Sequence, residues 1–110
     1  YTMIIAVSDP LCTGGDAVDV TITKKGFPNL SLIFKPDGSF VQQEEDVQLT
    51  TAPGKVIEAL KGRYAGYSAG NQIEKLILAD KTIQFMVDLN HQGITKEVIF
   101  DTEGNVVCEN

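Results

Sequence analysis

The sequence predicts an α+β domain in which an antiparallel β-sheet, formed by a duplicated β-meander, carries one main helix on one face. Three observations lead to this prediction. Much of the chain alternates apolar and polar residues between turn-forming residues, as half-buried strands do. One segment, from Thr51 to Gly66, has the periodicity of an amphipathic helix instead. The segments before and after it resemble each other in their strands and turn glycines.

The length and composition are those of one globular domain, and we expect residues 1–110 to share a single core. Hydrophobic residues make up 43% of the chain and charged residues 22%, which are ordinary values for a folded protein. The net charge is −6 and no basic cluster exceeds Lys24-Lys25, so we expect no nucleic-acid partner. No apolar run approaches the ~20 residues of a membrane span. The chain opens at Tyr1 rather than Met, so we expect that a leader has been removed.

Strands separated by tight turns are expected before the helix. Residues Thr2–Val7 form a short apolar run that predicts the first strand. Period-two alternation then predicts two strands whose apolar side chains are Val18, Val20, Ile22, Leu30, Leu32 and Phe34. Pro36-Asp37-Gly38 provides a turn into a further strand, from Ser39 to about Gln43. We interpret Glu44-Glu45-Asp46 as a solvated acidic edge.

The helix has recognisable ends and one apolar stripe. Thr51 can cap it, and Pro53 suits its first turn because the missing N–H has no partner to lose there. Gly66 is expected to end it in a left-handed conformation. Four apolar residues lie within about 100° of one another on a helical wheel, and they are Val56, Ile57, Leu60 and Tyr64. A single stripe implies a single packed face.

Aliphatic and alternating segments predict more strands after the helix, over residues 73–79, 83–89, 94–100 and 105–108. They are separated by Asp80-Lys81, by a turn that contains His91, and by the residues around Gly104. We expect His91, the only histidine, to be a solvated turn residue.

The two β regions match each other as an internal repeat. Val20-Thr21-Ile22 corresponds to Val87-Asp88-Leu89, and the dipeptide Ile33-Phe34 corresponds to Ile99-Phe100. We therefore predict two copies of a three-stranded meander, side by side in one sheet. The second copy follows the helix, but residues 1–17 hold no helical segment. A matching first helix either lies outside this sequence or does not exist.

A set of residues after the acidic segment forms a recognisable pattern: Pro53, Val56, Leu60 and Tyr64-Ala65-Gly66-Tyr67, followed by Phe85, Val87, Leu89, Phe100-Asp101 and Glu103-Gly104. This pattern resembles that of the PepSY-like family, and specifically of the small secreted proteins described as β-lactamase-inhibitor-like. It covers residues 47–108, and residues 18–43 through the repeat. The resemblance implies an antiparallel sheet with a helix on one face, export to the bacterial periplasm or cell surface, and a binding or inhibitory role with no cofactor.

The sequence contains no pattern typical of catalysis or metal binding. It has no phosphate-binding glycine loop, nucleophile elbow or Cys/His cluster. Asp101, Glu103 and Asn105 have the alternate spacing of the first ligands in an EF-hand calcium loop, but no later glutamate completes that pattern. We therefore interpret these residues as a turn. We therefore expect no enzyme, no cofactor and no metal site. Cys12 and Cys108 either form a disulfide that closes nearly the whole chain or remain two separate small apolar side chains.

The face opposite the helix is the candidate binding surface. If the helix covers Val20, Ile22, Leu32, Phe34, Phe85, Val87, Val98 and Phe100, the reverse face exposes apolar residues among polar ones. The candidate partner-binding residues there are Ile33, Met86, Glu97 and Ile99. We expect an exported binding module for a protein or peptide. The alternatives are a wet sheet with scattered apolar residues, or a structural domain of an envelope protein that self-associates, for example as a homodimer.

Overall fold

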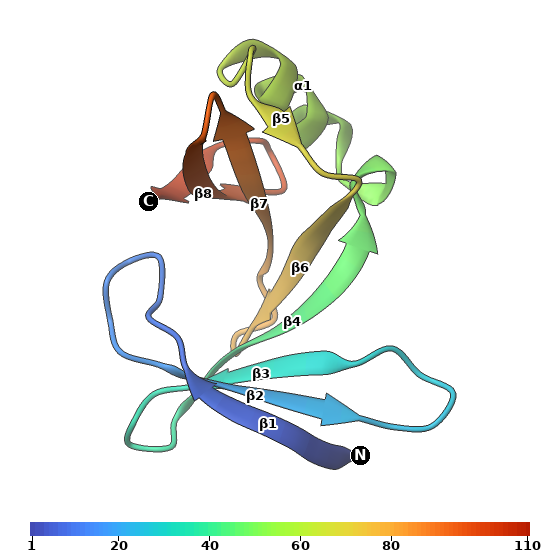
Figure 1. Ribbon diagram of the computed structural model, residues 1–110, viewed down its shortest axis with the longest axis vertical. Coiled ribbons are helices and arrows are strands. Elements are labelled where there is room, and N and C mark those ends of the chain that lie inside the picture. The colour runs from blue at the N-terminus through green and yellow to red at the C-terminus, as the bar shows by residue number, and fades with distance from the viewer.

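The computed structural model describes residues 1–110 and shows one antiparallel sheet with one α-helix (Figure 1). The elements are β1 (Thr2–Ser8), β2 (Val18–Thr23), β3 (Leu30–Phe34), β4 (Phe40–Gln48), the 3₁₀-helix η1 (Leu49–Thr51), α1 (Gly54–Gly62), β5 (Ser68–Ala69), β6 (Gln72–Leu78), β7 (Ile83–His91), β8 (Ile94–Asp101) and β9 (Val106–Glu109). The strand order is β1-β2-β3-β4-β6-β7-β8-β9, and β5 pairs with β7. The α+β class and the antiparallel sheet are therefore as the sequence predicts.

The sheet is strongly curved rather than flat. Strands β1, β2 and β3 lie at one end of the molecule, β7 and β8 lie at the other, and β4 and β6 run between them (Figure 1). Twist accumulates from strand to strand in any sheet, and the two central strands are long enough to turn one half against the other: β4 has nine residues and β6 has seven. The curvature gives the sheet an outer side and a concave side.

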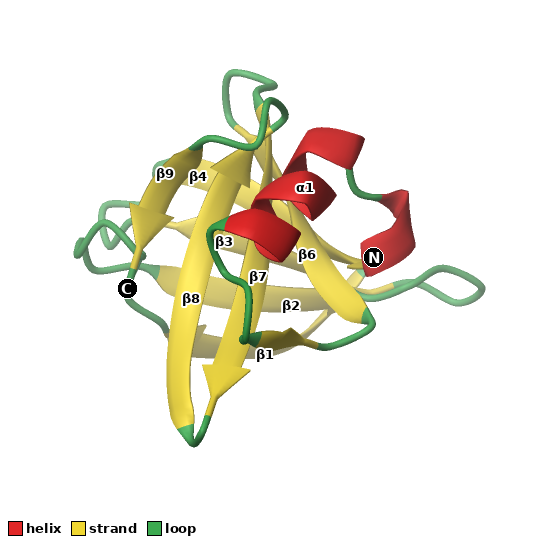
Figure 2. Cartoon of the chain, turned by 90° about the horizontal axis from the view of Figure 1, so that it is seen from above, coloured by secondary structure: helices red, strands yellow, loops and turns green.

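The main core lies between α1 and the outer side of the carboxyl-terminal strands (Figure 2). The cluster comprises Ala52, Val56, Tyr64, Ile73, Phe85, Val87, Leu89, Val98 and Phe100. Val56, Val87, Val98 and Phe100 have no exposed surface. Each such side chain contributes roughly 1.5–3 kcal/mol on burial, so this layer accounts for much of the stability of the fold.

The helix does not cover the outer face of the amino-terminal strands, contrary to the prediction. Val20, Ile22, Leu32 and Phe34 are half-buried and lie outside the α1 core. The reason is geometric: α1 has nine residues and is therefore about 13 Å long, which is too short to reach both halves of a curved sheet. The outer faces of the two halves consequently differ, one packed under α1 and one uncovered.

The helix begins later and ends earlier than predicted. Pro53 occupies the N-cap position and makes no side-chain capping bond. Thr51, the last residue of η1, donates a hydrogen bond from its hydroxyl group to the carbonyl of Gln48, which precedes η1. The helix ends at Gly62, and a turn leads to Gly66, which has a φ of 92°. The predicted stripe nevertheless faces the core, because Val56 and Tyr64 are buried in it and Ile57 and Leu60 pack against it.

The two meanders share details of register. Strands β2, β3 and β4 form one consecutive antiparallel set, and β7, β8 and β9 form another. The register shifts between Ile33 and Phe34 in the first set and between Ile99 and Phe100 in the second. The turns also match, since Gly38 N donates to Lys35 O (2.9 Å) and Gly104 N donates to Asp101 O (3.1 Å).

The acidic segment Glu44-Glu45-Asp46 is not a solvated edge, contrary to our interpretation. It lies inside β4, which pairs with β3 on one side and β6 on the other. Glu45 lies opposite Lys75 on the outer side of the sheet, while Glu44 and Asp46 point to the concave side. Three consecutive acidic residues favour a prediction of solvent exposure, because carboxylates are rarely buried in a central strand.

Candidate ligand-binding cavity

The concave side of the sheet forms a partly open cavity of about 640 Å³. It is lined by 24 residues, of which 10 are hydrophobic. They come from the loop after β1 and from β2, β3, β4, β6, β7, β8 and β9, so both halves of the chain contribute. A volume of this size lies within the range of 300–1,000 Å³ that is usual for ligand pockets.

Antiparallel register explains which side chains meet in the cavity, because directly opposed residues point to the same face. One row across the sheet contains Asp19, Ile33, Gln42 and Leu78. A second row contains Asp46, Glu74, Met86, Ile99 and Cys108. Asp88 and Glu97 oppose each other in the next row. Apolar and acidic positions therefore alternate along the same concave surface.

All four predicted partner-binding residues line this cavity. Ile33 comes from the amino-terminal half, while Met86, Glu97 and Ile99 come from the carboxyl-terminal half. The expectation that these apolar side chains face open solvent is wrong, because Ile33 is 3% exposed and Ile99 is 8% exposed. Curvature turns the two halves toward each other, so the reverse face of the predicted sheet becomes an apolar floor.

Seven carboxylates surround that floor, and no lysine, arginine or histidine accompanies them. They are Asp9, Asp19, Glu44, Asp46, Glu74, Asp88 and Glu97. The residue pattern could have revealed part of this set, since alternation places Asp88 on the face of Met86 and Asp19 on the face of Ile33. It could not reveal that the two faces line one partly enclosed space.

Glu74 has the most strongly perturbed acidity in the cavity. Burial is the largest cause, followed by a hydrogen bond with Glu44 and by the nearby charges of Glu44, Asp46 and Asp88, and together they raise the pKa of Glu74 to about 8. Two carboxyl groups share a hydrogen bond only when one of them keeps its proton. The Glu44–Glu74 pair therefore holds a proton at neutral pH.

Two other carboxyl groups show the same tendency. Burial, together with the charges of Asp88, Asp9 and Glu44, raises the pKa of Glu97. Burial raises the pKa of Asp19 against the opposing effect of a hydrogen bond from Ser31, and Asp19 Oδ1 is buried without a hydrogen-bond partner. No basic side chain of the cavity lining pairs with these carboxyl groups, so their affinity for a proton, or for another cation in its place, is increased.

The neutral polar groups help to hold the acidic wall in place. Gln42 is 8% exposed and donates a hydrogen bond from Nε2 to Glu44 Oε2 (2.8 Å). Because Gln42 neighbours Ile33 across β3 and β4, it connects the apolar floor to the carboxyl pair. Its burial was not expected from the sequence, since glutamine is mostly exposed in proteins.

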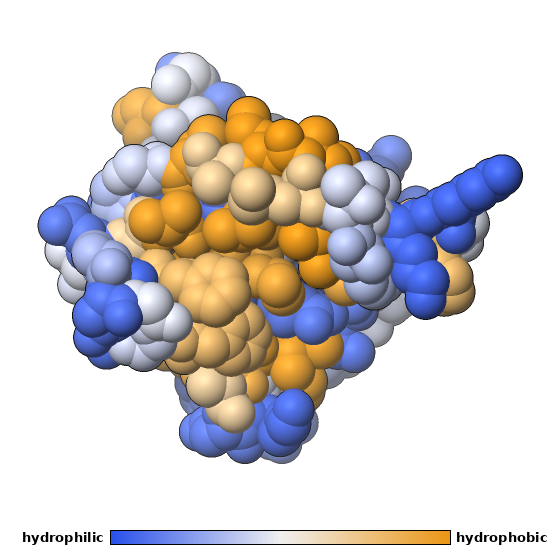
Figure 3. All heavy atoms as spheres, turned by 90° about the horizontal axis from the view of Figure 1, so that it is seen from below, coloured by the Kyte–Doolittle hydropathy of each residue, from blue (hydrophilic) through white to orange (hydrophobic).

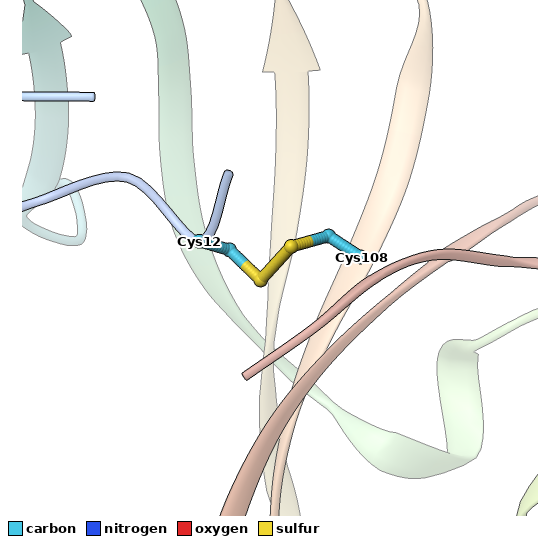
Figure 4. Close-up of a disulfide and its surroundings, with 2 residues drawn as sticks. All are labelled: Cys12 and Cys108. Carbon is cyan, nitrogen blue, oxygen red and sulfur yellow. A yellow bond between two sulfur atoms is a disulfide. The ribbon is translucent and has the colours of Figure 1, made fainter. Parts of the chain in front are cut away.

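A disulfide joins Cys12 and Cys108 (Figure 4). The two Cα atoms are 6.3 Å apart, and both cysteines line the cavity. Cys12 belongs to the loop that follows β1, and Cys108 belongs to β9. The bond therefore connects the loop after β1 to the last strand, and it holds the loop with Asp9 beside the carboxyl-terminal strands.

The other candidate positions lie away from the cavity. His91 ends β7 rather than lying in a solvated turn, and its Nδ1 donates to the carbonyl of Gly66 (2.8 Å). The Asp101 carboxylate accepts backbone hydrogen bonds from Glu103 and Asn105, as expected for a turn. No three cysteine, histidine or acidic side chains are arranged to hold a metal ion, so the cavity carboxylates are spread around a space rather than gathered at a point.

Comparison with known proteins identifies relatives of the fold. The chain superposes on a DUF2874 family protein from Bacteroides uniformis ATCC 8492 with a TM-score of 0.67 and 13% identity, over 99% of this chain and 78% of the other. A DUF2874 family protein from Bacteroides ovatus ATCC 8483 gives 0.65 and 12%, over 98% and 76%. A protein of Bacteroides eggerthii DSM 20697, described as "putative periplasmic", gives 0.68 and 13%, over 99% and 78%.

At these identities the similarity shows a common fold. No family model matches the sequence, and no curated protein matches it. Neither helix combines the length and the apolar character that crossing a membrane would require.

Proposed function

We propose that this protein is an exported, non-catalytic binding module that receives a positively charged segment of a protein or peptide in its concave cavity. One observation carries the proposal: seven carboxylates and no basic residue surround an apolar floor. Charge complementarity of this kind selects a partner of opposite sign and accelerates its approach.

The acidity of the cavity favours a cation over a neutral ligand. Bringing several carboxylates together in a partly enclosed space raises the free energy of their ionised forms, as the raised pKa values of Glu74 and Glu97 reflect. A bound ammonium or guanidinium group would lower that free energy and would give the buried Asp19 Oδ1 a hydrogen-bond donor.

The mixture of acid and hydrocarbon favours the side chains of a peptide. Lysine and arginine have an apolar stem and a charged end. Ile33, Met86 and Ile99 can contact the stem, while Asp88 and Glu97, which oppose each other at the cavity wall, can bind the charged end. The volume of about 640 Å³ accommodates more than one such side chain.

Export to the periplasm or cell surface is part of the proposal. A disulfide is stable in an oxidising compartment, and the chain contains one between Cys12 and Cys108. One structural neighbour is described as "putative periplasmic". Membership of the PepSY-like family remains a proposal that rests on the residues quoted above. Binding alone is proposed, because the comparisons give no support to an inhibitory role.

We further propose that the cavity arose by duplication of one meander. The matched register shifts at Ile33-Phe34 and Ile99-Phe100 support this origin, as do the matched turns at Gly38 and Gly104. Equivalent isoleucines from the two copies then form the floor from opposite sides, because each copy presents the same face to the concavity.

Isothermal titration calorimetry tests the proposed function directly. The probe is a blocked pentapeptide of alternating lysine and leucine, with the glutamate–leucine counterpart as the comparison. We expect the wild-type protein to bind the lysine peptide and not the glutamate peptide. The double variant Asp88→Asn/Glu97→Gln should bind the lysine peptide about tenfold more weakly than the wild type does. Glu45→Gln, on the outer side of β4, should bind as the wild type does. Equal affinity for both peptides, or no effect of the double variant, would refute the proposal.

A further inference from the structure

The edge strand β1 presents an uncharged, apolar surface. Every residue of Thr2–Ser8 is exposed, and Tyr1 and Phe27 lie exposed next to it. The exposed fractions are 64% for Met3, 56% for Ile4, 51% for Ile5 and 45% for Val7. Seen from below, the end of the molecule that carries β1, β2 and β3 shows a broad apolar area (Figure 3). Such an edge offers unpaired backbone groups and hydrophobic side chains to another strand.

The features that commonly prevent an edge strand from pairing with another chain are almost absent from β1. It contains no charged residue and no proline, and its one irregularity is the register shift between Met3 and Ile5. Residues Ile5–Ser8 pair regularly with β2. The net charge of −6 makes two copies repel over most of their surface, but not at this strand.

The two ends of β1 carry opposite charges. At its amino end, Lys24 Nζ lies over the ring of Tyr1, 5.6 Å from the centroid. At its carboxyl end, Asp9 follows Ser8 directly and forms no ion pair within the chain. Antiparallel pairing of two β1 strands would place Lys24 of each copy beside Asp9 of the other, whereas parallel pairing would bring like charges together. The charge distribution therefore favours an antiparallel partner with this same strand.

We propose that the chain forms a two-fold symmetric dimer in which β1 pairs antiparallel with β1 of a second copy. Full overlap of the seven-residue strand places Ile5 at the two-fold axis and Tyr1 opposite Asp9 of the other copy. The contact is closed, because each strand uses its only free edge. This proposal goes beyond the proposed binding function, and it shares one residue with the cavity, Asp9.

The opposite edge of the sheet is a poor partner for β1. Strand β9 has four residues, and its Glu109 already pairs with Lys96 (2.8 Å) and Arg63 (3.6 Å). Pairing of β1 with β9 of another copy would also leave one edge of each sheet open and would build a chain of copies rather than a closed pair.

Sedimentation velocity of the whole chain tests the dimer between about 1 μM and 1 mM, the range of dissociation constants that a small interface gives. We expect the mass to rise with concentration from 11.9 kDa toward twice that value. Ile5→Lys places two like charges at the axis and should keep the chain monomeric. Ile94→Lys changes another exposed isoleucine (60%, against 51% for Ile5) far along the sheet and should leave the dimer unchanged.

Charge exchange tests the antiparallel arrangement without altering the apolar strand. Asp9→Lys and Lys24→Glu should each weaken the dimer roughly five- to tenfold, and the combined variant should restore it. Both side chains are at the surface, so these variants decide the question even if Ile5→Lys folds poorly. A wild type that stays monomeric, a dimer that survives Ile5→Lys, or a double variant as weak as the single ones would overturn the proposal.

Discussion

Replacing Glu74 by glutamine tests the origin of the acidic cavity. The substitution keeps the shape of the side chain and removes the group that shares a proton with Glu44. Its pKa of about 8, against 4.5 in the unfolded chain, means that the folded state binds a proton more tightly than the unfolded state. The substitution should therefore change how the free energy of unfolding depends on pH.

The sign follows from the direction of the pKa shift. Below about pH 4.5 Glu74 is protonated in both states and contributes nothing to the pH dependence. Between pH 4.5 and 8 the unfolded state loses its proton first, so stability falls as the pH rises, and the full loss is reached above pH 8. The shift corresponds to at most about 5 kcal/mol. Since the side chain is only half-buried and solvent screens it, we expect roughly 1–2 kcal/mol.

Urea unfolding followed by circular dichroism from pH 5 to pH 8.5 provides the measurement. The free energy of unfolding should depend less on pH in Glu74→Gln than in the wild type. Across this pH range the variant should become the more stable of the two, by roughly 1–2 kcal/mol at the upper end. Glu45→Gln serves as the control, because Glu45 lies on the outer side of the adjacent strand opposite Lys75. If the curves of Glu74→Gln and the wild type run parallel, the carboxyl pair does not hold the proton that we infer.

Three further predictions concern the scaffold, and each is measured as a change in the free energy of unfolding by urea titration. Phe100→Ala should cost about 3–5 kcal/mol because Phe100 is fully buried, while Phe34→Ala, at the equivalent half-buried position, should cost less than half as much; equal costs would contradict the one-sided core. Cys12→Ser/Cys108→Ser should lower the free energy of unfolding by about 4 kcal/mol, since the disulfide joins residues that are 96 positions apart in the sequence. A urea midpoint equal to that of the wild type would show that the disulfide does not form. Gly38→Ala should lower the free energy of unfolding by about 1–2 kcal/mol, because Gly38 has a left-handed φ of 90°. Gly104→Ala should cost about 2 kcal/mol more than Gly38→Ala, because the new Cβ atom would clash with the Lys55 carbonyl. A smaller cost at Gly104 would mean that α1 does not lie against this turn.

Local patterns in the sequence were sufficient to predict most of the strands and the apolar stripe of the helix. Alternation at Val87 and Leu89 identified β7, because one face of that strand packs under α1. The same alternation placed Met86 and Ile99 on the other face, where the structure has them. These features depend on neighbours within a few residues, which a pattern along the chain records directly.

The cavity depends on curvature, which no local pattern records. Ile33 and Ile99 lie in one space only because β4 and β6 turn the two halves of the sheet toward each other. Glu44 and Asp46 look like surface residues in sequence, since nothing near them indicates that β6 will lie alongside. The prediction that the helix covers the whole outer face is wrong for the same reason, because the sequence does not show that the far half of the sheet bends away from the helix.

The most direct test of the cationic binding site is an amide NMR titration of the uniformly ¹⁵N-labelled protein with the lysine–leucine pentapeptide. We predict that the perturbed resonances map to cavity-lining residues on β3, β4, β7 and β8, with Glu97 and Ile99 among them, and that β1 and α1 stay unperturbed. Perturbations that map to the outer side of the sheet, or none at millimolar peptide, would contradict the account.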